Sequence, residues 1–284
     1  MRIAVIVLFA LLSVVLRGGA LCAADREVFS LEVGDFKISM LSEAQRDSGL
    51  DILIGASKED IAKFIPTGKY PSAVAAYLIQ SPDGAAMVDT GFGREIGRHL
   101  KSLGISEADV KTVLITHAHG DHIGGLLAGE KAAFPNARVI VSKLDYDWSQ
   151  QLRDSLGKYG GKFETITPGA IESGGVEVLP GIYAIEAYGH TPGHTMFLAE
   201  SGGKKLLIWG DLTHAMAIQM PRPEVSVTYD TDPVAAAGVR KRVLQFVSEN
   251  KIPVAGMHVA YPGVGDIAAD PDNPGGYKFI PKDN

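Results

Sequence analysis

One predicted strand runs directly into a cluster of metal-ligand side chains, and this feature constrains the chain more than any other. Residues 110–116 read VKTVLIT, a run rich in β-branched residues that is typical of a buried strand. The next six residues are His-Ala-His-Gly-Asp-His, which contribute His117, His119, Asp121 and His122. Imidazole and carboxylate groups are ligands for Zn²⁺ and other divalent first-row metals. The sequence therefore predicts a metal site at the turn that follows this strand.

Further ligand candidates follow other predicted strands. His190 and His194 lie in a Gly-His-Thr-Pro-Gly-His segment, Asp211 follows the strand predicted at 205–209, and His258 ends a strand near the C-terminus. Each residue alone is a weak indication, because a single Asp after a strand is more often a helix cap. Strand ends on one side of a sheet sandwich can converge on one cleft. The ordered set therefore indicates a shared metal site.

The remaining pattern predicts one α/β domain over residues 25–284, with layers of strands and helices around a core. Strands are expected at 72–80, 85–89, 138–142, 176–178, 182–187, 195–199, 205–209 and 252–258. Helices are expected at 95–103, 143–156 and 232–250, the last with Asp232 as N-cap and Pro233 in the first turn.

The N-terminus has the layout of a secretory signal peptide. Arg2 precedes an apolar run at 3–16, small residues follow, and we expect cleavage after Ala24, which makes 1–24 the signal peptide. An uncleaved anchor is the alternative, although the run is shorter than the roughly 20 residues that a membrane span needs. Cys22, the chain's one cysteine, would leave with the signal peptide, so the mature chain would have no disulfide. We expect a periplasmic or secreted protein without stable membrane insertion.

The charge balance argues against nucleic acid as a partner. The chain has 27 Lys+Arg against 33 Asp+Glu, a formal net charge of -6, and no run of basic residues. Phosphate contacts need clustered cations. The sequence therefore gives no indication of a nucleic-acid partner.

The ordered ligand set resembles the metallo-β-lactamase superfamily, whose pattern is His-x-His-x-Asp-His followed by His, Asp and His. The match runs from about Val74 to the C-terminus and includes Val-Asp-Thr-Gly at 88–91. The resemblance implies an αββα sandwich in a single domain, with two divalent metal ions. Zn²⁺ is the expected ion, and Mn, Fe or Co are alternatives. It also implies that Asp89 orients a ligand or loop and that His190 has a structural role in its loop.

The resemblance distributes the ligands over two ions. One ion would take His117, His119 and His194, the other would take Asp121, His122 and His258, and Asp211 would bridge both.

Several segments are most similar to the lactonase and methyl-parathion-hydrolase branch of that superfamily. They read AFPNA at 133–137, GHTPGHT at 189–195, GKKLLIWGDL at 203–212, PEVSVTYDTD at 223–232, GMHVAYPGVGD at 256–266 and GGYKF at 275–279. Members of that branch hydrolyse lactones, aryl esters and, in some cases, organophosphate triesters. The resemblance disfavours a β-lactamase, because such enzymes generally lack the bridging aspartate and several use a cysteine ligand. It is also compatible with a homodimer.

The expected chemistry is attack on a lactone or aryl ester by a hydroxide that bridges the two metals. Asp211 and Asp121 are the expected catalytic carboxylates, with Asp211 fixing the metal separation and accepting the proton of the nucleophile. His214 stands where related lactonases often have a tyrosine, so it either donates a hydrogen bond to the substrate or forms part of the pocket wall. Organophosphate triester hydrolysis is the main alternative. The other alternative functions are a different hydrolase that uses the same site and a non-catalytic metal-binding protein.

Apolar or aromatic side chains are expected to flank the cleft and to favour an aryl or alkyl group of the substrate. The candidates are Phe64, Ile65, Phe92 and Trp148, which lie in segments that flank the cleft in members of the family that the chain resembles. For Trp148 a place in the core is the better expectation.

Overall fold

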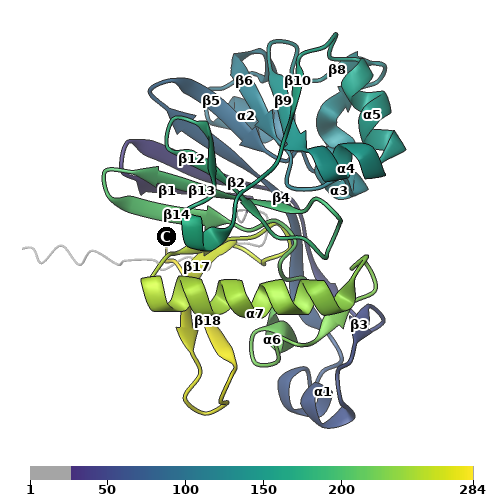
Figure 1. The fold of residues 1–284 in the computed structure, drawn as a ribbon, viewed down its shortest axis with the longest axis vertical. Helices are drawn as coiled ribbons and strands as arrows, with labels where there is room; N and C mark the ends of the chain where they lie inside the picture. The colour runs from purple at the N-terminus through teal and green to yellow at the C-terminus, as the bar shows by residue number, and fades with distance from the viewer. Residues whose placement is uncertain (1–26, 284) are drawn as a thin grey trace, which may run out of the picture.

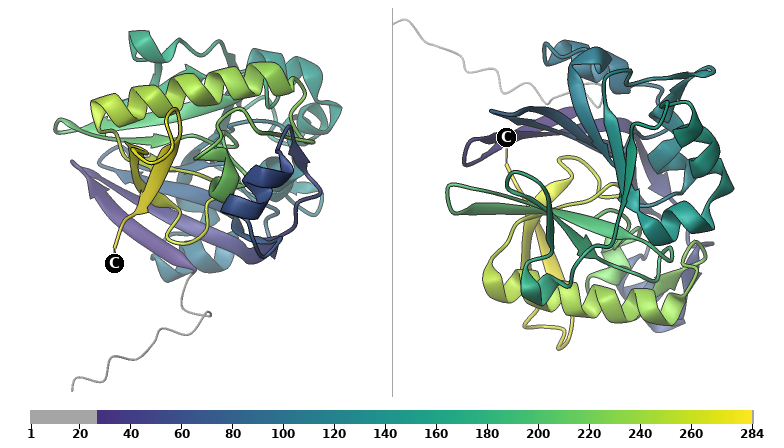
Figure 2. Two further views of the ribbon diagram at one scale, coloured as in Figure 1. Left: turned by 90° about the horizontal axis from the view of Figure 1, so that it is seen from below. Right: turned by 45° about the horizontal axis from the view of Figure 1, so that its top comes forward.

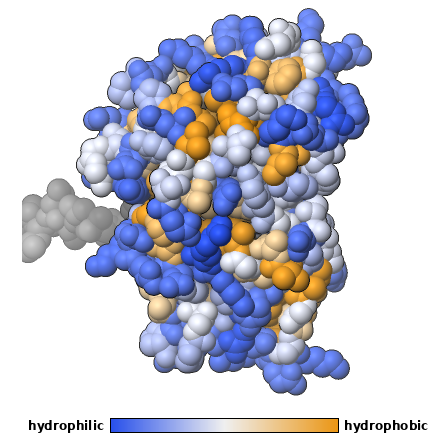
Figure 3. Space-filling view, in the orientation of Figure 1, coloured by the Kyte–Doolittle hydropathy of each residue, from blue (hydrophilic) through white to orange (hydrophobic). Residues whose placement is uncertain are grey.

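The structure, a computed structural model, describes residues 27–283. The predicted signal peptide at 1–24 lies outside these residues. None of the helices described is both long and apolar enough to cross a membrane. The face shown in Figure 3 is mostly hydrophilic, with smaller apolar groups between the polar ones.

Two seven-stranded sheets pack face to face, with helices on their outer sides (Figure 1). The first sheet, in spatial order, contains β1 (Val28–Val33), β2 (Phe36–Ser48), β4 (Tyr70–Ser81), β5 (Gly84–Val88), β6 (Val110–Leu114), β9 (Arg138–Ser142) and β10 (Phe163–Ile166). The second contains β11 (Val176–Leu179), β12 (Ile182–Glu186), β13 (Thr195–Ser201), β14 (Lys204–Ile208), β16 (Val254–Ala255), β17 (Val264–Ala269) and β18 (Tyr277–Pro281).

The helices lie on both outer faces, which makes the order of layers αββα, as predicted (Figure 2). The first sheet carries α2 (Ile96–Ser102), α3 (Gly120–Ile123), α4 (Lys143–Trp148) and α5 (Gln150–Gly157) on its side of the sandwich, and the second carries α7 (Pro233–Asn250). Asp232 caps α7 by accepting hydrogen bonds from the Val234 and Ala235 amides, as expected. The short elements α1 (Lys58–Phe64), β3 (Leu53–Ile54), α6 (Met216–Gln219) and β15 (Ser226–Val227) form an extension at one end of the sandwich.

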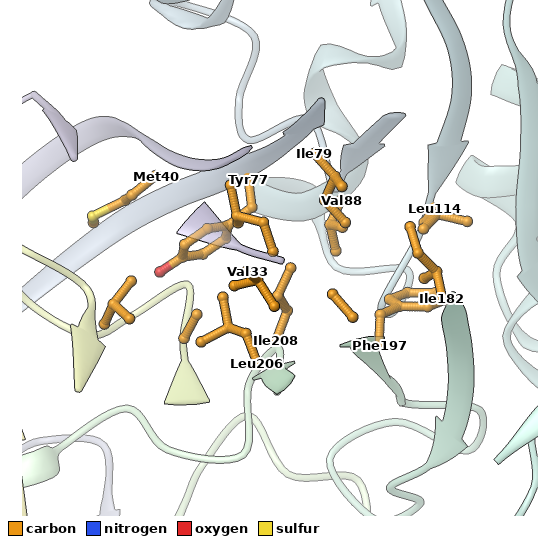
Figure 4. Close-up of a cluster of buried hydrophobic side chains, with 14 of the residues drawn as sticks. Val33, Met40, Tyr77, Ile79, Val88, Leu114, Ile182, Phe197, Leu206 and Ile208 are labelled. Carbon is orange, nitrogen blue, oxygen red and sulfur yellow. The ribbon is translucent and has the colours of Figure 1, made fainter. Parts of the chain in front are cut away.

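Apolar side chains from both sheets fill the space between them (Figure 4). Tyr77 and Val88 of the first sheet face Phe197 and Ile208 of the second, and all four are fully buried. Burial of apolar surface at about 25 cal/mol per Å² is the main stabilising contribution in such a core. The two sheets therefore form a rigid support for the loops at their edge.

Some elements differ from the prediction. The helix expected at 143–156 is two helices, because Ser149 is extended and caps α5 through the Leu152 amide. The strand expected at 252–258 is reduced to β16. β1, β2, β17 and β18 were not predicted. In β2 the buried positions include serines, so its sequence lacks a clear alternation of apolar and polar residues.

Candidate metal centre

The predicted ligands lie at one edge of the sandwich because of strand direction. In the first sheet β5, β6 and β9 run parallel, and in the second sheet β14 and β16 do. β12 also runs in their direction, since it and β14 are both antiparallel to β13. The carboxyl ends of these strands therefore face the same cleft, and the loops that follow them carry the ligand-type residues.

The first ligand group consists of His117, His119, His190 and Asp211. His119 Nδ1 lies 3.1 Å from His117 Nε2 and 3.0 Å from His190 Nε2. Asp211 Oδ2 lies 3.3 Å from His190 Nε2 and 3.6 Å from His117 Nε2. Two ligands placed about 2.05 Å from a tetrahedral zinc ion are ~3.3 Å apart. The four atoms thus have the spacing of ligands around one ion.

The second ligand group consists of Asp121, His122 and His258, and it also borders Asp211. Asp121 Oδ1 lies 3.7 Å from His122 Nε2, and its Oδ2 lies 3.5 Å from His258 Nε2. The two oxygens of Asp211 contact this group as well, at 3.2 Å from His122 Nε2 and 3.0 Å from His258 Nε2. Asp211 therefore lies between the two groups, where the sequence analysis placed a bridging residue.

Hydrogen bonds on the far side of the rings determine which nitrogen faces the cleft. Thr116 Oγ1 donates to Asp89 Oδ2 at 2.6 Å, so it accepts from His117 Nδ1 at 3.0 Å. Asp89 also accepts from His122 Nδ1 at 2.7 Å, as expected of a residue that orients a ligand. Because these Nδ1 atoms carry the protons, the Nε2 lone pairs of both rings face the cleft.

His190 and His258 are held in the same way. His190 Nδ1 donates to Asp230 Oδ1 at 2.8 Å, and His258 Nδ1 donates to the Ala73 carbonyl at 2.8 Å. Their Nε2 lone pairs also face the cleft. Four imidazole lone pairs thus converge beside carboxylates, which is the donor set that a divalent cation requires.

His190 and His194 have exchanged the places that the sequence analysis gave them. His194 Nδ1 donates to the Ala187 carbonyl at 3.1 Å, and its Nε2 accepts from the Asp211 amide at 3.1 Å. Both nitrogens of His194 are therefore engaged by backbone groups, and neither offers a lone pair to a metal. His190, expected to have only a loop-structural role, takes the position in the first ligand group.

Gly210 shows how closely His194 supports the Asp211 loop. Its φ is 59°, and a Cβ there would lie 2.4 Å from His194 Nε2 and 3.1 Å from the Thr116 Cβ. Only glycine combines this backbone conformation with that close approach. His194 therefore packs against the Gly210 turn and holds the backbone of Asp211 in place.

Protons and carboxylates set the charge of the cleft. Burial, and to a smaller extent the nearby His190 ring, lower the pKa of His119 to about 4. Burial also disfavours the charged form of His258, but Asp211 and Asp121 outweigh it and raise the pKa of that ring. Burial likewise opposes ionisation of Asp211, yet His122 and His258 hold its pKa well below the usual range. Without a metal, protons on His258 and its neighbours thus balance the buried carboxylates.

Two buried atoms support the metal interpretation directly. His122 Nε2 and Asp211 Oδ1 have no hydrogen-bond partner among the described residues, although both are shielded from solvent. Buried polar atoms without partners are rare and unfavourable unless an ion or water satisfies them. Together with the convergent lone pairs, they show that the residues present fit two divalent cations.

A cavity of about 600 Å³ opens onto these groups. His214 lines it, 5% exposed, with Nε2 3.0 Å from Asp211 Oδ2 and with no hydrogen-bond partner on Nδ1. Burial lowers the pKa of His214 to about 4, which keeps the ring neutral. Phe92 also lines the cavity, as expected. Trp148 is not among the lining residues, and its ring lies beside that of His119, with the centroids 5.8 Å apart. Tyr229, which was not predicted, lies on the wall near His214.

Phe64 and Ile65 do not line this cavity. Both residues pack instead with the extension formed by α1 and α6. That position was not foreseeable from the sequence, because the fold of the extension depends on contacts between distant segments.

Three supporting residues were also missed by the sequence analysis: Thr116, Asp145 and Asp230. Asp230 lies in the PEVSVTYDTD segment, but nothing in that segment distinguishes a carboxylate that holds His190 from a turn residue. Asp145 lies in a predicted helix, where an acidic residue is expected to face solvent.

A family model described as the metallo-beta-lactamase superfamily matches residues 70–251. The chain belongs to the metallo-β-lactamase superfamily. The matched region includes both ligand groups except His258. The predicted fold is confirmed. The prediction that the chain belongs to a family of metal-dependent hydrolases is confirmed as well.

The chain is similar to curated members of the superfamily over part of their length. It is 28% identical over 157 residues to an N-acyl homoserine lactonase of Bacillus sp, covering 45% of this chain and 58% of that protein. It is 27% identical over 173 residues to N-acyl homoserine lactonase AttM of Agrobacterium fabrum, covering 49% and 64%. The chain thus spans less than two thirds of these relatives.

Solved structures extend the likeness to nearly the whole chain. AidC, described as a dizinc quorum-quenching lactonase in complex with a product, has a TM-score of 0.80 at 22% identity, covering 91% of this chain and 98% of that one. Hydrolase AbOPH has a TM-score of 0.79 at 22% identity, with the same coverage. At this level of identity the likeness establishes the fold.

Proposed function

We propose that this protein is a dinuclear-metal hydrolase that opens lactones or cleaves aryl esters. The expected ions are two Zn²⁺. When bound, they would supply a hydroxide as nucleophile and polarise the substrate carbonyl. The first ion would be held by His117, His119 and His190. The second would be held by Asp121, His122 and His258, with Asp211 shared by both.

One observation carries this proposal. Four histidines present Nε2 lone pairs to one cleft, with their Nδ1 protons held by fixed acceptors, and a buried carboxylate lies between them. Seven protein ligands would serve two ions, with Asp211 shared, which leaves room for water on the cavity side, as in catalytic rather than structural zinc sites. The similarity to N-acyl homoserine lactonases supports a lactone as the substrate.

The charges around the cavity favour a neutral substrate. Asp47, Asp51 and Asp121 line it, and Arg46 is the one Lys or Arg among the described lining residues. Apart from the two ions, which the ligand carboxylates partly neutralise, an anionic phosphodiester would meet Asp47 and Asp51 with Arg46 as its one protein cation. A lactone, a neutral ester or a phosphotriester avoids this repulsion.

The side chains at the cleft have separate roles in this proposal. Asp211 fixes the separation of the two ligand groups and accepts the proton of the nucleophile, and Asp121 completes the second group. His214 lines the cavity and donates a hydrogen bond to the substrate carbonyl from Nε2, which lies 3.0 Å from Asp211 Oδ2. We also propose export to the periplasm or the medium, on the strength of residues 1–24, and a homodimer in solution.

A substrate panel tests the proposed activity. Metal-loaded protein without residues 1–24 would be assayed with an N-acyl-homoserine lactone, an aryl lactone, an aryl ester, paraoxon, a cephalosporin and an aryl phosphodiester. Each assay would be repeated after EDTA treatment and with Asp211→Ala. The matched control is Asp147→Asn, which changes an exposed carboxylate on α4 whose one ion-pair partner within residues 27–283 is Lys143.

We expect lactone or aryl-ester turnover that EDTA and Asp211→Ala abolish and that Asp147→Asn leaves intact. Dominant paraoxon turnover would move the substrate to phosphotriesters. Cephalosporin turnover, or full activity in Asp211→Ala, would contradict the proposal.

A further inference from the structure

Asp145 is a buried carboxylate that joins the two loops of the first ligand group. It lies on α4 with no exposed surface, outside both ligand groups. Its Oδ2 accepts from the Ala118 amide at 2.8 Å and from Thr191 Oγ1 at 2.9 Å. Its Oδ1 accepts from the Gly193 amide at 2.6 Å. One side chain therefore holds the backbone between His117 and His119 against the backbone just after His190.

The loop after His190 packs so closely against α4 that no side chain fits at position 193. A Cβ on Gly193 would lie 2.5 Å from both the Asp145 amide nitrogen and Ser142 Oγ. Glycine at this position lets the loop approach the first turn of α4 closely enough for the carboxylate to reach it. The position of the loop is thus set by Asp145 together with the helix that carries it.

A structural role alone is a poor explanation for a charge at this position. Among residues 27–283, Asp145 has no ion pair with a lysine or arginine, and its three donors are uncharged. Burying a carboxylate without a cation is unfavourable. A carboxylate nevertheless offers two acceptor oxygens, so one can accept from Ala118 and Thr191 while the other accepts from Gly193, whereas an amide would turn an N–H toward one of these donors.

The second ligand group has different anchors. The His122 carbonyl accepts from the Thr90 amide at 2.8 Å and from Thr90 Oγ1 at 2.9 Å, while Asp89 holds the His122 ring. His258 is held by the Ala73 carbonyl. None of these contacts involves Asp145.

We propose that Asp145 is a positioning residue for the metal ion held by His117, His119 and His190, and that it sets the distance between their two loops. This inference rests on the proposed dinuclear site. The second ion is held independently of Asp145.

Metal titration of Asp145→Asn separates the two ions. In this variant the amide oxygen can still accept from Ala118 and Thr191, but the amide nitrogen faces the Gly193 N–H. The loop after His190 therefore loses one of its two hydrogen bonds and meets a donor that opposes its own. Loss of an outer partner of metal-binding histidines typically weakens metal affinity about 10–100-fold. We expect one of two Co²⁺ or Zn²⁺ equivalents to weaken by about that factor, while the other keeps its wild-type affinity.

The readouts are competition with a chelating dye, metal content after dialysis, and the visible absorption spectrum of the Co²⁺ protein. Asp147→Asn, on the same helix but exposed, is the matched control and should bind both ions as the wild type does. Thr191→Val, which removes one donor at nearly constant volume, should weaken the same ion by a smaller factor. It also provides the test if Asp145→Asn does not fold.

Equal weakening of both ions, or unchanged binding of both in the folded variants, would overturn the positioning role. Wild-type protein that binds fewer than two ions would instead contradict the proposed dinuclear site, and the positioning role with it. The two failures are thus distinguished by the wild-type titration.

Discussion

Asp89→Asn tests how strongly the outer carboxylates support the ligands. Asp89 has a φ of 59°, a left-handed conformation that asparagine tolerates well, so the backbone should be kept. The carboxylate accepts three hydrogen bonds, from the Thr116 amide at 2.7 Å, Thr116 Oγ1 at 2.6 Å and His122 Nδ1 at 2.7 Å. The asparagine amide group must face at least one of these donors.

The expected loss follows from those contacts. A hydrogen bond to a charged group contributes about 1.5–3 kcal/mol, and a buried donor without a partner costs about 1–3 kcal/mol. Burial raises the pKa of Asp89, which means that the native charge is itself unfavourable and offsets part of the loss. We therefore expect the free energy of unfolding of metal-free protein to fall by about 2 kcal/mol.

Urea denaturation of EDTA-treated protein at pH 7 would measure this change, with Asp83→Asn on the exposed β4–β5 turn as control. Asp89→Asn should also bind zinc about 10–100-fold more weakly, because the His122 ring loses its charged acceptor. A free energy of unfolding within about 0.5 kcal/mol of wild type, the usual range for surface substitutions, would refute the reasoning.

Three further outcomes are expected. His190→Ala should leave one metal ion per chain, whereas His194→Ala should lower the melting temperature and still allow two ions, as metal analysis would show. Burial lowers the pKa of His194 to about 3, while an unfolded histidine takes up a proton near its ordinary value of 6.5. The free energy of unfolding should thus fall, through His194, by up to about 1.4 kcal/mol per pH unit as the pH falls from 6.5 toward 3. Urea denaturation of metal-free His194→Asn should show a smaller dependence on pH. His214→Phe should lower kcat for a lactone by about 100-fold with the metal content unchanged, and an unchanged kcat would make His214 a wall residue.

The convergence of the candidate ligands was predictable because ligand-type residues follow strands in a fixed order. Those strands run parallel within their sheets, so their ends meet at one edge, and a one-dimensional pattern was enough to predict the cleft. Asp89 was expected to orient a ligand or loop, and it lies at the same edge, after β5, where it accepts from His122 Nδ1.

The choice between His190 and His194 was not available from the sequence. Both rings lie in one short loop, and which of them has its nitrogens taken by backbone groups depends on the path of β13 and of the Gly210 turn. Asp145 and Asp230 were missed for a similar reason, because they act through contacts with loops far away in the chain.

Anomalous diffraction at the zinc edge, from crystals grown with Zn²⁺, would test the central claim most directly. The account predicts two peaks about 3.5–4 Å apart on either side of Asp211. One peak should lie beside the nitrogens of His117, His119 and His190, and the other beside His258 and its group. A single peak, or a peak coordinated by His194, would contradict the account.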